Sequence, residues 1–166
     1  MVRAILEGRK TQTRRIIKKV KEGPDGFLVP DNGKKIVCPY GQPVDRLWVR
    51  ETWARNGLRV WFKASDPQLD FKWHPSIHMK RGYSRIDLEV LKVGVERLQD
   101  ISEEDAKSEG VEPAKVFQKN IIKNFLLESR GEYYGGFQQI WRRINGGGSW
   151  EINPWVWVVE FRRVRP

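Results

Sequence analysis

The sequence is poor in the residues that build disulfides and metal sites: it holds one cysteine, Cys38, and two histidines among 166 residues. A lone cysteine cannot form an intrachain disulfide, and two histidines make a Cys/His metal site a poor expectation. The chain also lacks an apolar run of about 18 residues, and it has no charged-then-apolar start typical of a secretory leader. We therefore expect a cytoplasmic protein without a membrane span, a metal or a cofactor.

Positive charge, by contrast, is abundant. The chain has 31 Lys and Arg against 21 Asp and Glu, a formal net charge of +10. Residues 1–21 alone hold eight cationic side chains against Glu7. Such an excess favours a polyanionic partner, with RNA the first candidate, although solubility alone is an alternative explanation.

The first half of the chain predicts short strands. A helix over 1–8 ends at Gly8, and a strand follows over 14–20. Residues 27–37 have the pattern of a hairpin with its turn at 30–33. Strands are expected over 47–53 and 59–64, and a long one with alternating apolar residues over 84–98.

The second half predicts helices before a closing strand. Ser102 and Asp105 form a capping pattern, and the helix that they open ends at Gly110. A loosely amphipathic helix is expected over 114–127, and another around 137–144 with an apolar i, i+3, i+4, i+7 pattern. Residues 154–164 form a strand with aromatic residues on one face. These elements predict one α+β domain over 1–166, a small mixed β-barrel with peripheral helices.

Residues 8–15 read Gly-Arg-Lys-Thr-Gln-Thr-Arg-Arg. They resemble the Gly-x-Lys-x-x-Glu-x-Arg motif of the ASCH domain family, with Thr13 in place of the usual glutamate. The blocks DRLWVRETW, HPSIHM, SRIDLEV, ERLQDISEEDA and NPWVWVVEF extend the resemblance to prophage-type ASCH proteins along the whole chain. The resemblance implies a PUA-like barrel that binds RNA or nucleotides. Relatives usually carry another strand before the first helix, which this chain lacks, and glycine where it has Val44.

The resemblance also suggests a reaction. The family includes a bacterial N(4)-acetylcytidine amidohydrolase, proposed to use a lysine, a threonine and a glutamate. Its starting motif, Gly-Arg-Lys-Thr-x-Thr-x-Arg, places the catalytic lysine on Lys10 and the threonine on Thr13. The glutamate of the short helix aligns with Glu109. The resemblance thus implies hydrolysis of an acyl group from a cytosine nucleoside.

Chemistry makes this assignment testable. A threonine hydroxyl needs a base, and a lysine can serve when burial or neighbouring cations lower its pKa. A nearby carboxylate such as Glu109 would raise that pKa, so the two influences oppose each other. On a regular strand Lys10 and Thr13 would face opposite sides. The catalytic hypothesis therefore predicts an irregular backbone at residues 9–12.

Other residues are candidates for binding a substrate or nucleic acid: Arg9, Arg14, Arg15, Trp48, Arg50, Glu51 and Trp53. Arginines beside the motif suit phosphate, or form a solvated strand face. The two tryptophans suit base stacking, or fill the barrel core. The glutamate suits a cytosine amine, or pairs with Arg50.

Three functions follow from these observations. The leading hypothesis is recognition of RNA or a modified nucleoside by a monomer or homodimer, with amidohydrolase activity through Lys10, Thr13 and Glu109. The first alternative is a non-catalytic RNA-binding module or a phage interaction protein. A ribonuclease is the further alternative, although no histidine pair or acidic cluster supports the usual cleavage chemistry.

Overall fold

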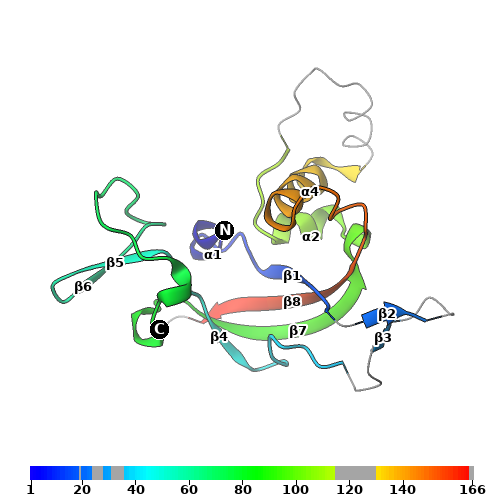
Figure 1. The fold of residues 1–166 in the computed structure, drawn as a ribbon, viewed down its shortest axis with the longest axis horizontal. Coiled ribbons are helices and arrows are strands. Elements are labelled where there is room, and N and C mark those ends of the chain that lie inside the picture. The colour runs from blue at the N-terminus through cyan, green and yellow to red at the C-terminus, as the bar shows by residue number, and fades with distance from the viewer. Residues whose placement is uncertain (19, 24–27, 31–35, 115–129, 165–166) are drawn as a thin grey trace.

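The computed structural model describes residues 1–18, 20–23, 28–30, 36–114 and 130–164 (Figure 1). Its largest element is a four-stranded antiparallel sheet in the order β1-β8-β7-β4. The sheet strands are β1 (Gln12–Ile16), β4 (Arg46–Trp48), β7 (Asp87–Arg97) and β8 (Trp155–Val164). Two further strand pairs lie outside this sheet: β2 (Val20–Glu22) with β3 (Leu28–Pro30), and β5 (Trp53–Asn56) with β6 (Arg59–Phe62).

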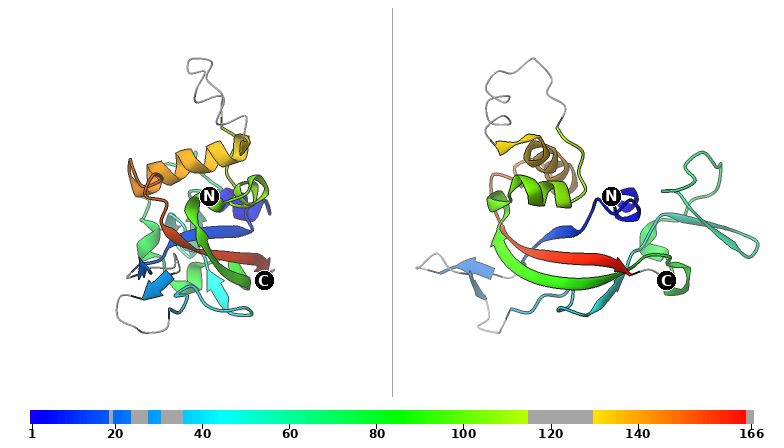
Figure 2. Two further views of the ribbon diagram at one scale, coloured as in Figure 1. Left: turned by 90° about the vertical axis from the view of Figure 1, so that its right-hand side faces the viewer. Right: turned by 180° about the vertical axis from the view of Figure 1, so that it is seen from behind.

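The sheet is curled because β7 and β8 are long and bend together along their length (Figure 2). A register shift between Val90 and Lys92 marks an irregularity in their ladder, and such bulges bend a strand pair. The resulting half-barrel, with a few helices beside it, confirms the α+β class.

The two faces of the sheet are buried against different elements. On β8, Trp157, Val159 and Phe161 are buried on one face, in line with the alternation of a strand. Val156 lies on the other face and packs with residues of the helices. These helices are α2 (Glu103–Ser108) and α4 (Glu132–Asn145), while α1 (Val2–Leu6) packs through Ile5 against Phe161. Three short 3-10 helices, η1 (Ser76–His78), η2 (Arg81–Tyr83) and η3 (Leu98–Asp100), complete the described elements.

Local capping places α2 and α4. The Ser102 side chain accepts a hydrogen bond from the Asp105 backbone N–H, which confirms the predicted start of α2. The Glu103 carboxylate accepts from the backbone N–H groups of Tyr133 and Tyr134. It thereby satisfies two donors that the first turn of α4 would otherwise leave without partners. The helix expected over 114–127 lies, apart from Ala114, outside the described residues.

The strand predicted over 47–53 is wrong. β4 ends at Trp48 and β5 begins at Trp53, which pairs with Phe62 of β6 rather than with the sheet. Glu51, between them, is 1% exposed and held by Arg85 on both carboxylate oxygens. Because that carboxylate must be buried against its partner, the chain leaves the sheet here.

The strand predicted over 14–20 also differs, since β1 begins at Gln12 and ends at Ile16. The hairpin predicted over 27–37 has its turn residues 31–33 outside the described part of the chain. There β3 pairs with β2. Across the described ranges, no helix combines the length and the apolar character needed to cross a bilayer.

Candidate functional site

Lys10 lies in the irregular segment between α1 and β1. Its backbone N–H donates to the Ala4 carbonyl, and the Thr11 N–H donates to the Ser108 carbonyl at the end of α2. Lys10 and Glu109 form an isolated antiparallel bridge. Since β1 begins only at Gln12, residues 9–11 are outside the regular strand, as the catalytic hypothesis requires.

The Lys10 ammonium and the Glu109 carboxylate form a buried ion pair. Lys10 Nζ lies 2.5 Å from Glu109 Oε2, and the two residues are 6% and 2% exposed. Nζ also donates to the Glu109 backbone carbonyl at 2.9 Å and to the Gln12 carbonyl at 2.7 Å. An ammonium has three donors, so all of them have acceptors in this arrangement.

The contact with the Gln12 carbonyl brings Lys10 close to Thr13. That carbonyl belongs to the peptide group that joins Gln12 to Thr13, so Nζ is one peptide group away from the threonine backbone. Thr13 Oγ1 is buried, and it forms no hydrogen bond with a described residue. A buried hydroxyl without a partner is uncommon in proteins. The structure therefore places a free hydroxyl beside the buried ion pair.

Burial changes the proton affinity of Lys10. Desolvation lowers the pKa of the Lys10 ammonium from its usual 10.5, and the nearby Arg15 and Arg14 lower it further. The charge and hydrogen bond of Glu109 act in the opposite direction, and burial prevails. The competition expected from the sequence is thus resolved in favour of a lysine that loses its proton more readily than one in water.

Arg14 completes the charge arrangement. Its side chain has no exposed surface, and its guanidinium lies 2.6 Å from Glu96, 3.2 Å from Asp105 and 3.6 Å from Glu109 Oε1. Gln12 accepts a further hydrogen bond from Arg14 and donates one to Asp105. The proposals that Arg14 binds phosphate or belongs to a solvated strand face are wrong for this reason: its donors face carboxylates under α2.

Gly110 permits the close approach of Lys10 to α2. It has φ +70°, a conformation that residues with a Cβ rarely adopt. A Cβ at this position would lie 2.6 Å from the Lys10 Cβ and 2.8 Å from the Ala4 Cβ. The sequence indicated Gly110 only as the end of a helix. The glycine also leaves room for the lysine that pairs with Glu109.

Arg9 and Arg15 are both exposed. Arg9 forms ion pairs with Glu7 at 2.7 Å and Glu112 at 3.2 Å. Arg15 has the same strand parity as Thr13, and the two pair with Trp157 and Val159 of β8. Side chains two residues apart on a strand share a face, so Arg15 lies on the face of β1 that carries Thr13.

The other binding candidates lie elsewhere. Trp48 is on β4, the opposite edge strand of the sheet from β1, and Arg50 lies over its ring at 4.8 Å. Glu51 pairs with Arg85 and not with Arg50, so that sequence alternative is wrong. Trp53 is 9% exposed and stacks on His74. The described contacts join none of these four candidates to Lys10, Thr13 or Glu109.

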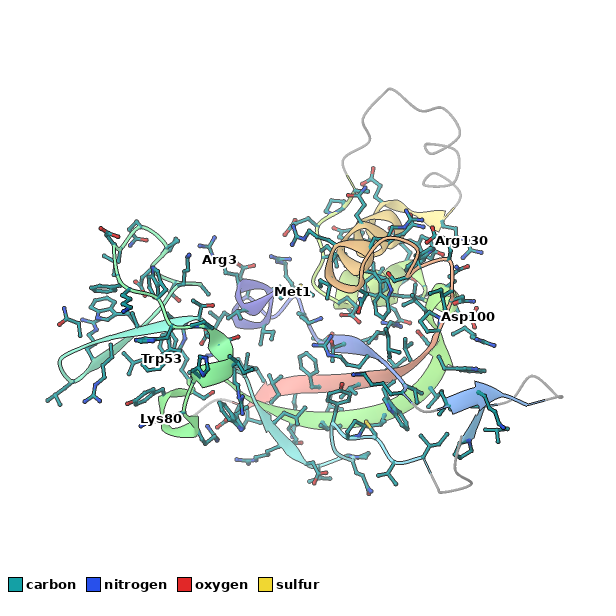
Figure 3. All side chains as sticks on the ribbon, viewed as in Figure 1. Met1, Arg3, Trp53, Lys80, Asp100 and Arg130 are labelled. Atoms are coloured by element: carbon teal, nitrogen blue, oxygen red, sulfur yellow. The ribbon has the colours of Figure 1, made fainter. Side chains whose placement is uncertain are left out.

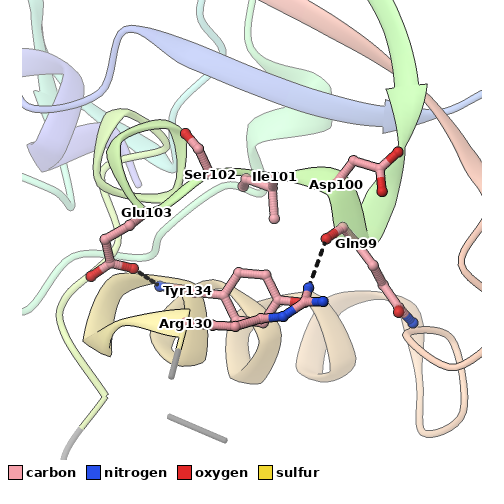
Figure 4. A pocket seen from close by; sticks show the side chains of 7 residues that line it. All are labelled: Gln99, Asp100, Ile101, Ser102, Glu103, Arg130 and Tyr134. Carbon is pink, nitrogen blue, oxygen red and sulfur yellow. Dashed lines mark hydrogen bonds between the residues drawn. The ribbon is translucent and has the colours of Figure 1, made fainter. Parts of the chain in front are cut away.

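Two cavities near the helices are separate from Thr13. One of about 310 Å³ lies beside Arg14 and is lined by Gln12, Lys92, Gly94, Val95, Glu96, Asp105, Val158 and Glu160. It opens on the face of β1 that carries Gln12, opposite Thr13. Another of about 380 Å³ lies between η3, α2 and α4, where Arg130 donates to the Gln99 carbonyl (Figure 4).

Three residues of the site escaped the sequence analysis: Gln12, Glu96 and Asp105. The strand parity of Gln12 and Arg14 was the available signal, because it places both on one face. Glu96 and Asp105 are far from them along the chain, and only the β7–β8–β1 register and the start of α2 bring them together.

Comparison with known proteins gives no relative: no family model, no curated protein and no solved structure matches this chain.

Proposed function

We propose that this chain is an ASCH-type amidohydrolase that removes the acyl group from N(4)-acetylcytidine and related acylated cytosine nucleosides. One observation carries the proposal: the buried Lys10–Glu109 pair lies beside the buried, unpartnered hydroxyl of Thr13. Lysine, threonine and glutamate are the three residue types that the resemblance to the ASCH family requires, and they occur at the positions that it implies.

Burial supports a chemical role for the pair. Removing two charges from water costs about as much as their attraction returns, so buried ion pairs seldom add stability. Groups with perturbed pKa values gather at functional sites. A lysine whose pKa burial lowers is suited to accept a proton near neutral pH.

The reaction takes two steps. Lys10 passes its proton to Glu109, and the neutral amine turns from the Gln12 carbonyl towards Thr13 Oγ1. Thr13 Oγ1 then attacks the acyl carbon while Lys10 takes the hydroxyl proton. The bond to the cytosine N4 breaks as N4 receives that proton, and cytidine leaves. Water, activated by Lys10, hydrolyses the threonine ester to acetate and restores the hydroxyl.

Arg15 serves the substrate in this scheme. It is exposed and lies on the same face of β1 as Thr13. A guanidinium there can donate to the acyl oxygen as negative charge develops on it, which is the role of an oxyanion donor. Arg14, held by carboxylates, instead limits how far Glu109 can move.

The backbone at Val44 gives independent support for the family assignment. Val44 has φ +80°, a conformation that strains a β-branched residue and suits glycine. ASCH relatives usually carry glycine at this position. The strain is what results when a valine occupies a backbone conformation built for glycine.

Turnover of N(4)-acetylcytidine tests the proposal. We expect the protein to release cytidine, measured by chromatography, and Lys10→Met, Thr13→Val and Glu109→Gln each to abolish release. Lys107→Met, which removes an exposed lysine of α2, is the matched control and retains activity. Absence of turnover in the wild type would contradict the proposal. Binding of the nucleoside without turnover would favour the non-catalytic alternative, and cleavage of an RNA oligonucleotide would favour the ribonuclease.

A further inference from the structure

The segment 53–85 forms an arm beside the curled sheet, built on the β5–β6 hairpin (Figures 1 and 2). It holds seven Lys and Arg against Asp66 and Asp70. Half of the net charge of +10 therefore lies in about a fifth of the chain. Trp53, on this arm, lies far from Asp100 and Arg130 near the helices (Figure 3).

Most of these cations have no acid to neutralise them. Arg81 pairs with Asp87 and Arg85 with Glu51. The other five form no salt bridge with a described residue, and all are exposed: Arg55, Arg59, Lys63, Lys72 and Lys80. Clustered cations of this kind attract a polyanion.

Aromatic rings accompany the cations. The Trp61 ring lies 5.7 Å from Phe71, whose ring lies 5.9 Å from Trp73, and all three are half-buried. Arg59 lies over the Trp61 ring at 3.9 Å. None of the three aromatic residues belongs to a hydrophobic core cluster of the described residues. These rings therefore remain partly open beside unpaired charge.

We propose that the arm binds single-stranded nucleic acid, with phosphates on Arg59, Lys63 and Lys72 and bases stacked on the Trp61–Phe71–Trp73 rings. Aromatic side chains interleaved with cations are the surface that a single strand requires, because its bases are free to stack. A duplex, whose bases are already stacked, would use the cations alone. The proposal does not rest on the amidohydrolase activity, since the arm residues make no contact with Lys10 or Thr13 among those described.

Fluorescence polarisation with fluorescein-labelled dT12 and U12 tests this surface. We expect binding that weakens as salt rises. Arg59→Gln/Lys63→Gln/Lys72→Gln should weaken it and reduce the log–log salt slope by about 2, since each phosphate contact on a single strand contributes about 0.7. Arg143→Gln, an exposed cation of α4, is the control and leaves affinity and slope unchanged.

Trp61→Ala separates stacking from charge. It should reduce affinity about 5- to 150-fold, the range of one base–aromatic stack, and leave the salt slope unchanged. If circular dichroism shows that this variant is unfolded, the triple variant decides alone. Three results would overturn the proposal: no oligonucleotide binding at low salt, equal binding by the triple variant and the wild type, or binding to anionic phosphatidylserine vesicles without binding to either oligonucleotide. Thr13→Val should bind the oligonucleotides normally, so failure of catalysis and failure of this surface remain distinguishable.

Discussion

Replacing Glu109 with glutamine leaves a buried ammonium without its counter-charge. Glu109 is the one described carboxylate within ion-pair distance of Lys10, and the lysine is 6% exposed. Loss of one partner of a buried pair costs about 3–5 kcal/mol. Lys10 can instead lose its proton. Starting from its usual pKa of 10.5, deprotonation at pH 7 costs about 4.8 kcal/mol, which sets the upper limit.

The pH dependence of this cost has a definite sign. In Glu109→Gln the folded state holds a neutral Lys10, while the unfolded chain holds it protonated below pH 10.5. The unfolded state then binds more protons, so the free energy of unfolding rises with pH. Between pH 7 and pH 9 the stability deficit of the variant should therefore shrink by up to about 2.7 kcal/mol.

Urea denaturation followed by the fluorescence of the eight tryptophans measures both quantities. The double variant Lys10→Met/Glu109→Gln is the control, because it has no titrating lysine at this site and its stability deficit should stay constant with pH. Lys10→Met alone should cost less than Glu109→Gln, since Arg14 remains 3.6 Å from the Glu109 carboxylate. A Glu109→Gln deficit below about 0.5 kcal/mol at pH 7, the size of a surface substitution, would refute this reasoning.

Three further results are expected. Arg14→Met should lower the free energy of unfolding by about 3–5 kcal/mol, whereas the exposed Arg15→Met should change it by less than about 0.5 kcal/mol, both measured in urea. Val44→Gly should raise the melting temperature, because it removes left-handed strain of about 1–2 kcal/mol. The Lys10 pKa, followed through its ¹³Cε shift by NMR, should lie below 10.5, and Glu109→Gln should lower it further because it removes the carboxylate that raises it.

Patterns local in the sequence predicted the elements well. The period of apolar residues identified α4 and the two long strands, and the Ser102 pattern identified the start of α2. The strand over 47–53 was predicted wrongly, because the buried contact of Glu51 with Arg85 lies 34 residues away along the chain. A local pattern carries no information about such a partner.

The candidate site divides along the same line. The resemblance suggested Lys10 and Glu109 together, and the structure places them in contact. The burial of Arg14 was not predictable, since an arginine beside another arginine reads as a solvated pair. Its environment depends on Glu96 and Asp105, which are brought near by strand register and helix docking. Charges at a distance in sequence thus decided what neighbouring residues could not.

The most direct measurement of the central claim is a time course of acetate release from N(4)-acetylcytidine by ¹H NMR, with the wild type and Thr13→Val side by side. Valine keeps the shape of threonine and removes only the hydroxyl. The account predicts equal amounts of acetate and cytidine from the wild type and neither from the variant. Release by Thr13→Val at the wild-type rate, or no release by either protein, would contradict it.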